Sequence, residues 1–144
     1  MKNFYNIIQG DCLEVLPTLE DSFFDFIVTD PPFLAVFGTT ADKNDIGNYS
    51  IIEGWFSSIA KEFYRVLKPS GKLMLFCDWR SYPSFWRSIM KHNFEQRNLV
   101  VWINDAARKY NLFRFCHQFI FVATKPPFTP SAPPGHTFDY HKTK

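Results

Sequence analysis

An acidic residue, two prolines and an aromatic residue follow one another at Asp30-Pro31-Pro32-Phe33. The apolar residues 26–28 before them are typical of a short buried parallel strand. Because proline cannot continue a strand ladder, the strand is expected to end there and the chain to turn out at its carboxyl end. Ligands bind at that end in open α/β sheets. The sequence therefore predicts a carboxylate, Asp30, at a ligand-binding edge, with the rigid ring of Phe33 close by.

A second acidic residue, Asp11, follows a glycine at the end of an apolar segment. Residues 4–9 are expected to form a first strand and Gly10 the turn after it. Asp11 is suited to cap the following helix, with Glu14 three positions further on as in a capping box. An N-cap is a sufficient structural reason for Asp11, and it leaves a further role open.

The rest of the chain alternates between helix and strand patterns, which predicts an α/β sheet that is parallel at least in its middle. Asp78 follows a predicted strand and is expected to cap the next helix, or else to touch a ligand. The loop predicted at 104–114 carries Arg108, Lys109 and Arg114. These charges suit either a solvated loop or contacts to phosphates. The predicted elements are helices at 52–67 and 82–92, strands at 72–77, 99–103 and 115–124, and loops at 34–50 and 104–114.

Three landmarks resemble those of a known enzyme family. The tetrapeptide at residues 30–33 resembles the catalytic motif of amino-group DNA methyltransferases, which methylate the exocyclic amine of adenine or cytosine. The order of the landmarks resembles that of the circularly permuted, beta-class members of the DNA methylase N-4/N-6 family, and the match continues more loosely to about Lys125. The landmarks are residues 8–12 with Leu16, residues 25–33, and residues 65–73, where a helix end, a turn and a strand are expected.

The resemblance implies a role for each residue of the tetrapeptide. The Asp30 carboxylate and the Pro31 carbonyl would accept the two hydrogens of the amine and localise its lone pair toward the methyl group of S-adenosylmethionine. Pro31 and Pro32 would hold that carbonyl in place, and Phe33 would stack on a base flipped out of double-stranded DNA. In this family an aspartate at the first position usually accompanies adenine, so the resemblance favours the N6 atom of adenine.

The resemblance also implies a fold and a cofactor site. The fold would be a partial Rossmann-like, S-adenosylmethionine-dependent methyltransferase sheet with helices on both faces. Asp11, Cys12 and Asp30 would lie beside the cofactor.

One expected motif is missing from these residues. Complete permuted enzymes carry an aromatic-x-Gly-x-Gly cofactor turn after the elements above, whereas residues 126–144 contain a single glycine, Gly135. We therefore expect an incomplete catalytic domain over 1–125, a proline-rich extended or disordered tail over 126–144, and exposed sheet edges. A second chain or a homodimer would supply the cofactor half. A non-catalytic derivative that binds nucleic acid or a partner, and less readily an RNA methyltransferase, are the alternative functions.

Composition narrows the class of protein. The 144 residues suit one domain with a core of its own, and aromatic residues make up 19% of them. Most aromatic side chains are expected in the core, although some could stack on bases. The net charge of +2 does not by itself indicate nucleic acid. Widely spaced cysteines, histidines without ligand spacing, and the lack of a signal peptide or membrane-length apolar run predict a cytoplasmic protein without a metal site or membrane association. The family resemblance implies an enzyme of bacterial, phage or prophage type.

Overall fold

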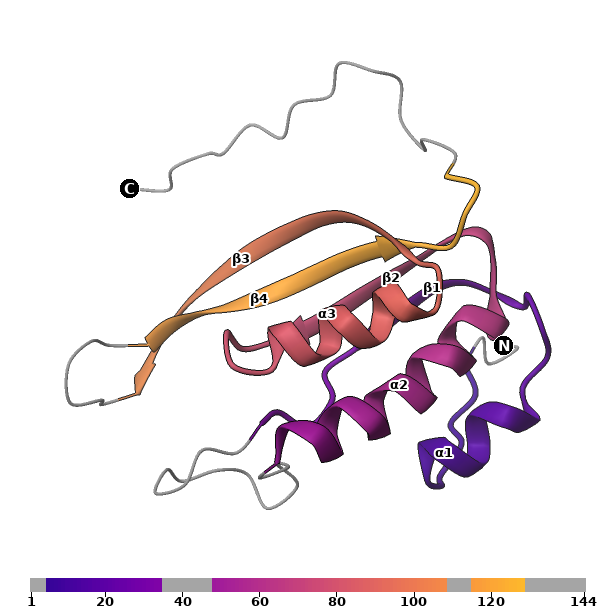
Figure 1. The fold of residues 1–144 in the computed structure, drawn as a ribbon, viewed down its shortest axis with the longest axis horizontal. Helices are drawn as coiled ribbons and strands as arrows, with labels where there is room; N and C mark the ends of the chain where they lie inside the picture. The colour runs from indigo at the N-terminus through magenta and orange to yellow at the C-terminus, as the bar shows by residue number, and fades with distance from the viewer. Residues whose placement is uncertain (1–4, 35–47, 109–114, 129–144) are drawn as a thin grey trace.

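The computed structural model describes residues 5–34, 48–108 and 115–128, and of residues 104–108 and 115 only the backbone. Its strands form one sheet in the order β1-β2-β4-β3 (Figure 1). β1 and β2 are parallel, and β4 runs antiparallel to both β2 and β3. The elements are α1 (Cys12–Val15), the 3-10 helix η1 (Leu16–Thr18), β1 (Phe24–Thr29), α2 (Tyr49–Val66), β2 (Leu67–Cys77), α3 (Tyr82–Lys91), β3 (Glu95–Arg108) and β4 (Phe115–Thr124).

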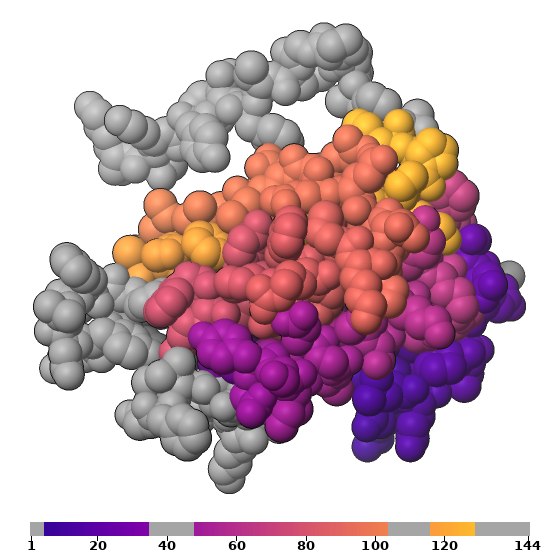
Figure 2. Space-filling model, in the orientation of Figure 1, coloured from indigo at the N-terminus to yellow at the C-terminus, as the bar shows by residue number. Residues whose placement is uncertain are grey.

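The two long helices lie on the same side of the sheet (Figure 1). The expected helices on both faces are therefore not found among the described elements. In the space-filling view, the atoms of the two helices form a continuous layer, and those of β3 and β4 are seen above it (Figure 2). Alternate residues of β2 and β4 face this layer and are almost completely buried, as the period of two in a strand requires. The core lies between the helices and the sheet. Its main residues are Phe56 and Ile59 of α2, Phe85 and Ile89 of α3, Leu73 and Leu75 of β2, and Phe121 and Ala123 of β4.

Helix α2 confirms the predicted apolar stripe and begins slightly before the predicted range. Asn48 caps it, since its side-chain oxygen accepts hydrogen bonds from the Ser50 and Ile51 amides at 2.8 and 3.2 Å. At the other end, the Arg65 guanidinium donates to the Leu16 and Leu19 carbonyls. These bonds fasten η1 and the segment after it to the end of α2.

The expected first strand at residues 4–9 is wrong for the part that the structure describes. Residues 5–9 have no regular structure, and Ile7 is 84% exposed. A strand needs a neighbour for its backbone groups, and no described strand offers one to this segment. The capping role of Asp11 is confirmed, because its carboxylate accepts a hydrogen bond from the Leu13 amide at 2.8 Å. Pro17 lies in η1, where α-helical geometry has already ended.

The remaining elements follow the prediction with three differences, the first of which is that β2 begins at Leu67 and not at residue 72. The helix expected at 82–92 and the strand expected at 115–124 are confirmed as α3 and β4. β3 is longer than predicted at both ends: it begins at Glu95, and it runs on to Arg108, which pairs with Phe115 after an irregular stretch where a loop was expected.

The expectation of a sheet that is parallel at least in its middle is wrong for the described strands. Only the edge pair β1 and β2 is parallel, and β4 lies between β2 and β3 antiparallel to both. Most of the loop expected at 34–50 lies outside the described residues.

The irregular first part of β2 depends on a glycine. Strand β2 starts directly after α2, and Ser70 within it has a positive φ of 66°, at the position where the sequence predicted a turn. A Cβ atom at Gly71 would lie 2.7 Å from the Lys68 carbonyl oxygen, a backbone atom. Glycine is therefore required there for the close approach of two backbone segments.

We predict that Gly71→Ala lowers the free energy of unfolding by about 1–3 kcal/mol, because the backbone must move to remove the overlap. Gly54→Ala is the matched control: a Cβ there meets no atom within 4 Å, in the middle of α2. This control should raise stability by roughly 0.5–1 kcal/mol through its helix preference. Urea unfolding followed by circular dichroism measures both, and a Gly71→Ala protein as stable as the wild type would contradict the prediction.

Candidate active site

Asp30 lies where the sequence predicts it, at the carboxyl end of β1. The parallel register pairs Thr29 with Leu75, so Asp30 stands beside the end of β2. The residue is exposed, but the neighbouring protein removes part of its hydration and raises the pKa of the carboxyl group. Among the described residues none donates a hydrogen bond to this carboxylate. Asp30 therefore keeps its acceptor positions for a ligand.

A buried thiol, that of Cys77, lies at this edge, within reach of the charges of two carboxylates. Burial raises the pKa of Cys77 to about 12, and the charges of Asp78 and Asp30 contribute to the rise. The Cys77 thiol thus stays protonated near neutral pH and is unsuited to be a nucleophile. The parallel pairing of β1 with β2 confirms that their carboxyl ends lie together, as the sequence predicts if the strands are neighbours.

The chain just after the tetrapeptide is fixed by Ser81. The Leu34 amide donates a hydrogen bond of 2.8 Å to the Ser81 hydroxyl oxygen, and both residues are buried. The Ser81 amide in turn donates to the Asp78 carboxylate at 2.8 Å. Asp78 also pairs with Arg80, so its side chain serves the start of α3 in the manner of a cap. These bonds tie the end of the tetrapeptide to the end of β2.

Sequence reasoning missed Ser81. Its place just before the predicted helix is a normal capping signal, but the bond to Leu34 spans 47 positions and has no local pattern. The three residues between Asp30 and Leu34 are half-buried, and Phe33 packs against the core. The ring of Phe33 is therefore held in place on its inner side.

The structure does not join the predicted cofactor residues Asp11 and Cys12 to Asp30 by any hydrogen bond or ion pair among the described residues. They lie at the start of α1, and the following η1 is fastened to Arg65 at the far end of α2. Partial burial, with the charge of Asp11, raises the pKa of the Cys12 thiol. Their part in binding a cofactor stays a prediction.

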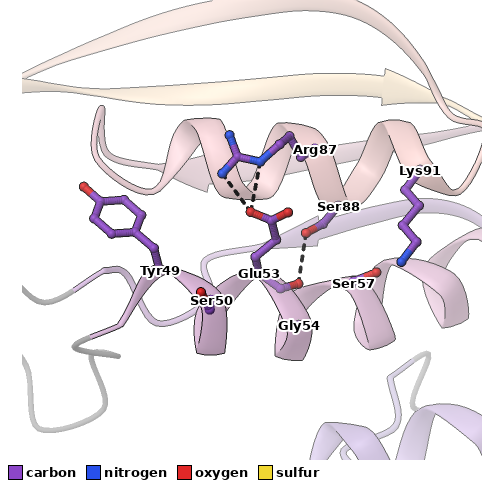
Figure 3. A pocket seen from close by; sticks show the side chains of 8 residues that line it. All are labelled: Tyr49, Ser50, Glu53, Gly54, Ser57, Arg87, Ser88 and Lys91. Atoms are coloured by element: carbon purple, nitrogen blue, oxygen red, sulfur yellow. Dashed lines mark hydrogen bonds and ion pairs between the residues drawn. The ribbon is translucent and has the colours of Figure 1, made fainter.

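A polar hollow of about 390 Å³ lies between α2 and α3 (Figure 3). The Arg87 guanidinium crosses it to Glu53 with hydrogen bonds of 2.9 and 2.7 Å, and the Ser88 hydroxyl donates to the Glu53 carbonyl oxygen at 3.2 Å. These contacts join the two helices. None of the predicted site residues lines this hollow, so its contacts serve packing and it is separate from the Asp30 edge.

Two further observations concern only the described part of the chain. No three histidine, cysteine or acidic side chains gather there in a way that could hold a metal ion. No helix there combines the length and apolar character needed to cross a bilayer.

The family comparison covers most of the chain. The N6_N4_Mtase family model, described as DNA methylase, matches residues 24–144. The Escherichia coli (strain K12) protein YubD is 28% identical over 118 residues, which make up 82% of this chain and 51% of YubD. The type II methyltransferase M.BamHI of Bacillus amyloliquefaciens is 32% identical over 80 residues, 54% of this chain and 19% of that protein. The chain thus spans about half the length of YubD and less of M.BamHI.

Solved structures show the same fold. The DNA modification methylase TTHA0409 of Thermus thermophilus, in complex with S-adenosyl-L-methionine, superposes with a TM-score of 0.65 at 18% identity over 87% of this chain and 57% of that one. The cytosine-N4-specific PvuII DNA methyltransferase gives a TM-score of 0.65 at 17% identity over 83% and 48%. These similarities confirm the Rossmann-like α/β fold class that the sequence predicts.

Ser81→Ala should lower the free energy of unfolding by about 1–3 kcal/mol, because the buried Leu34 amide loses its acceptor. Ser58→Ala is the control: its hydroxyl lies on the exposed side of α2 and donates a bond of 3.3 Å to the Gly54 carbonyl. That change should stay within roughly 0.5 kcal/mol. Hydrogen exchange gives a residue-specific test, and an unchanged exchange rate of the Leu34 amide in Ser81→Ala would refute the role of Ser81.

A second prediction concerns pH. Because burial raises the pKa of Asp30 in the folded state, the charged carboxylate costs stability above its unfolded pKa, and this cost disappears as the group is protonated in acid. Asp30→Asn should therefore be more stable than the wild type at pH 7, with the difference shrinking as pH falls through the folded pKa. Thermal melts from pH 3 to 7 measure this, and a variant less stable than the wild type at pH 7 would show that the carboxylate is favourably paired.

Proposed function

Because the chain belongs to the N6 and N4 DNA methylase family, we propose that it transfers a methyl group from S-adenosylmethionine to the exocyclic amine of a base in DNA. The observation that carries the proposal is the position of Asp30, at the carboxyl end of β1 with free acceptor positions and reduced hydration. That is the edge at which α/β sheets bind ligands.

The proposed chemistry starts from a weak nucleophile. The lone pair of an aromatic amine is delocalised into its ring, and two fixed acceptors on its hydrogens localise it toward the sulfonium methyl group. Asp30 supplies one acceptor and the Pro31 carbonyl the other. The nitrogen–carbon bond forms as the sulfur–carbon bond breaks, and the methylated amine then loses one proton. A carboxylate with a raised pKa is a better proton acceptor than a fully hydrated one.

Phe33 and Pro32 have positioning roles in this proposal. The half-buried ring of Phe33 is fixed by the core on one side and offers its remaining surface to a base that has left the duplex. Pro32 keeps the turn rigid and so fixes the direction of the Pro31 carbonyl.

The cofactor assignment is supported by TTHA0409, whose solved complex contains S-adenosyl-L-methionine. Asp11 and Cys12 are proposed to lie near it, and the glycine-rich turn expected of the family is absent from residues 1–144. We therefore propose that residues 1–125 form one part of a catalytic domain and that the remaining part comes from elsewhere. Pro127 and Phe128 of the proposed tail contact Ser70 and Arg97, so the packed region extends slightly beyond residue 125.

Adenine is the proposed acceptor because the tetrapeptide begins with Asp30. The PvuII enzyme, which has a similar fold, is described as specific for the N4 atom of cytosine. The fold alone therefore gives no preference between the two bases, and the product must be identified.

The test is methyl transfer from radiolabelled S-adenosylmethionine to unmethylated duplex DNA, followed by digestion to nucleosides. The reaction is run with the 144-residue chain alone and with the chain plus the part of YubD that it does not match. We expect label in N6-methyladenine and at least a 100-fold loss of rate in Asp30→Asn, since general acid–base groups contribute about 10²–10⁴-fold. Label in N4-methylcytosine would correct the base, and no label in either mixture would favour a non-catalytic derivative.

A further inference from the structure

The turn between β2 and α3 lies beside the candidate site. Residues 78–81 form this turn, directly after the last residue of β2. Because β1 and β2 are parallel neighbours, the chain that leaves each of them emerges at the same edge of the sheet. The hydrogen bond from the Leu34 amide to the Ser81 hydroxyl joins the two emerging segments. The turn 78–81 is therefore attached to the segment 30–34, which holds the candidate site.

The turn presents a large aromatic side chain at this edge. Trp79 is 52% exposed, although the protein has a closed core between its sheet and its helices. A single exposed apolar residue needs no explanation by itself. The position of this one beside Asp30 is the reason to consider a function. An aromatic ring stacks on the face of any base that has lost its neighbour in the duplex.

The backbone and the side chains of the turn limit the positions open to Trp79. The Asp78 carboxylate, which is buried, accepts hydrogen bonds from the Ser81 amide and the Arg80 guanidinium. The central carbon of that guanidinium lies 5.9 Å from the centre of the Trp79 ring, within the range of a cation–π contact. A side chain that is held before binding loses less conformational freedom when it stacks on a ligand.

We propose that Trp79 contacts DNA, with its indole stacked on the base next to the target base in the same strand. When the target base leaves the duplex, its neighbour loses a stacking partner, and Trp79 replaces part of that lost contact. Phe33 then holds the extruded base and Trp79 the flanking one. The inference rests on the proposed function, because only extrusion of the target base creates such an unstacked neighbour.

A purely structural role for Trp79 is the alternative. In that case the ring covers the turn and packs against Arg80, and its removal lowers stability without a selective effect on DNA. The two roles differ in what a change of ring to aliphatic side chain does. Leucine keeps apolar bulk at position 79 but has no flat face to stack, whereas phenylalanine keeps the flat face.

The test measures how the 144-residue chain binds two labelled duplexes that differ in one adenine, mismatched in one and paired in the other. Fluorescence anisotropy gives the dissociation constants. The wild type should prefer the mismatched duplex, whose adenine leaves the stack more easily. Trp79→Ala should weaken binding to this duplex about 5- to 150-fold, the loss expected for one base–aromatic stack. Trp79→Phe should restore most of the affinity, and Trp79→Leu should not.

A second readout reports on the flanking base itself. 2-Aminopurine, placed first on one side and then on the other side of the mismatched adenine, fluoresces strongly when unstacked and weakly when stacked on a ring. With saturating protein, one of the two positions should stay dim in the wild type and become bright in Trp79→Ala. Because the protein is saturating, this signal does not depend on affinity or on small changes in stability.

Trp86→Ala is the matched control. Trp86 is 39% exposed on α3, and its indole donates a hydrogen bond of 2.9 Å to the Gln96 side-chain oxygen. Gln96 pairs with Ala123, which pairs with Leu73 inside β2. The Trp86 ring is thereby held away from the edge where Asp30 lies. Its removal should change both readouts less than twofold.

Four results would overturn the inference: no binding of the mismatched duplex by the wild type, equal binding by Trp79→Ala, full affinity in Trp79→Leu, or an unchanged 2-aminopurine signal. The proposed function is tested separately by methyl transfer. Binding that depends on Trp79 without methyl transfer supports the contact and removes the function. Methyl transfer that Trp79→Ala leaves unchanged, with unchanged binding, supports the function and removes the contact.

Discussion

The hydrogen bond from the Leu34 amide to the buried Ser81 hydroxyl fixes the geometry on which the candidate site depends. Two prolines end β1 abruptly, and without an anchor the chain beyond them would have many available directions. Ser81, itself held by Asp78, gives that chain one direction and attaches it to the end of β2. Asp30 is thereby left at the sheet edge with its oxygens unused, instead of being drawn into a structural ion pair.

Burial on only one side of the sheet is the second constraint. The core between the sheet and the two long helices is closed, with the inner residues of β2 and β4 almost inaccessible. The opposite face and the β1 edge expose side chains of the kind that a complete sheet would cover. Residues 5–9 form no strand and pair with none of the described strands.

Local sequence patterns predicted the elements that depend on local chemistry. The stripe of α2, the Asp11 cap and the turn of Asp30 into two prolines each follow from neighbouring residues, and the structure confirms them. What failed depends on distant pairing. The end of β3 is a strand only because β4 returns beside it, and Ser81 acts on a residue 47 positions away. The family resemblance predicted the fold class, but the described contacts leave the cofactor roles of Asp11 and Cys12 as proposals.

Calorimetric titration with S-adenosylmethionine tests the central claim most directly, namely that these 144 residues carry the acceptor side of a methyl-transfer site whose cofactor side lies elsewhere. The account predicts no saturable heat with the 144-residue chain alone and micromolar binding once the unmatched part of YubD is added. Micromolar binding by the chain alone would contradict it, because residues 1–144 would then form a cofactor pocket without the glycine-rich turn.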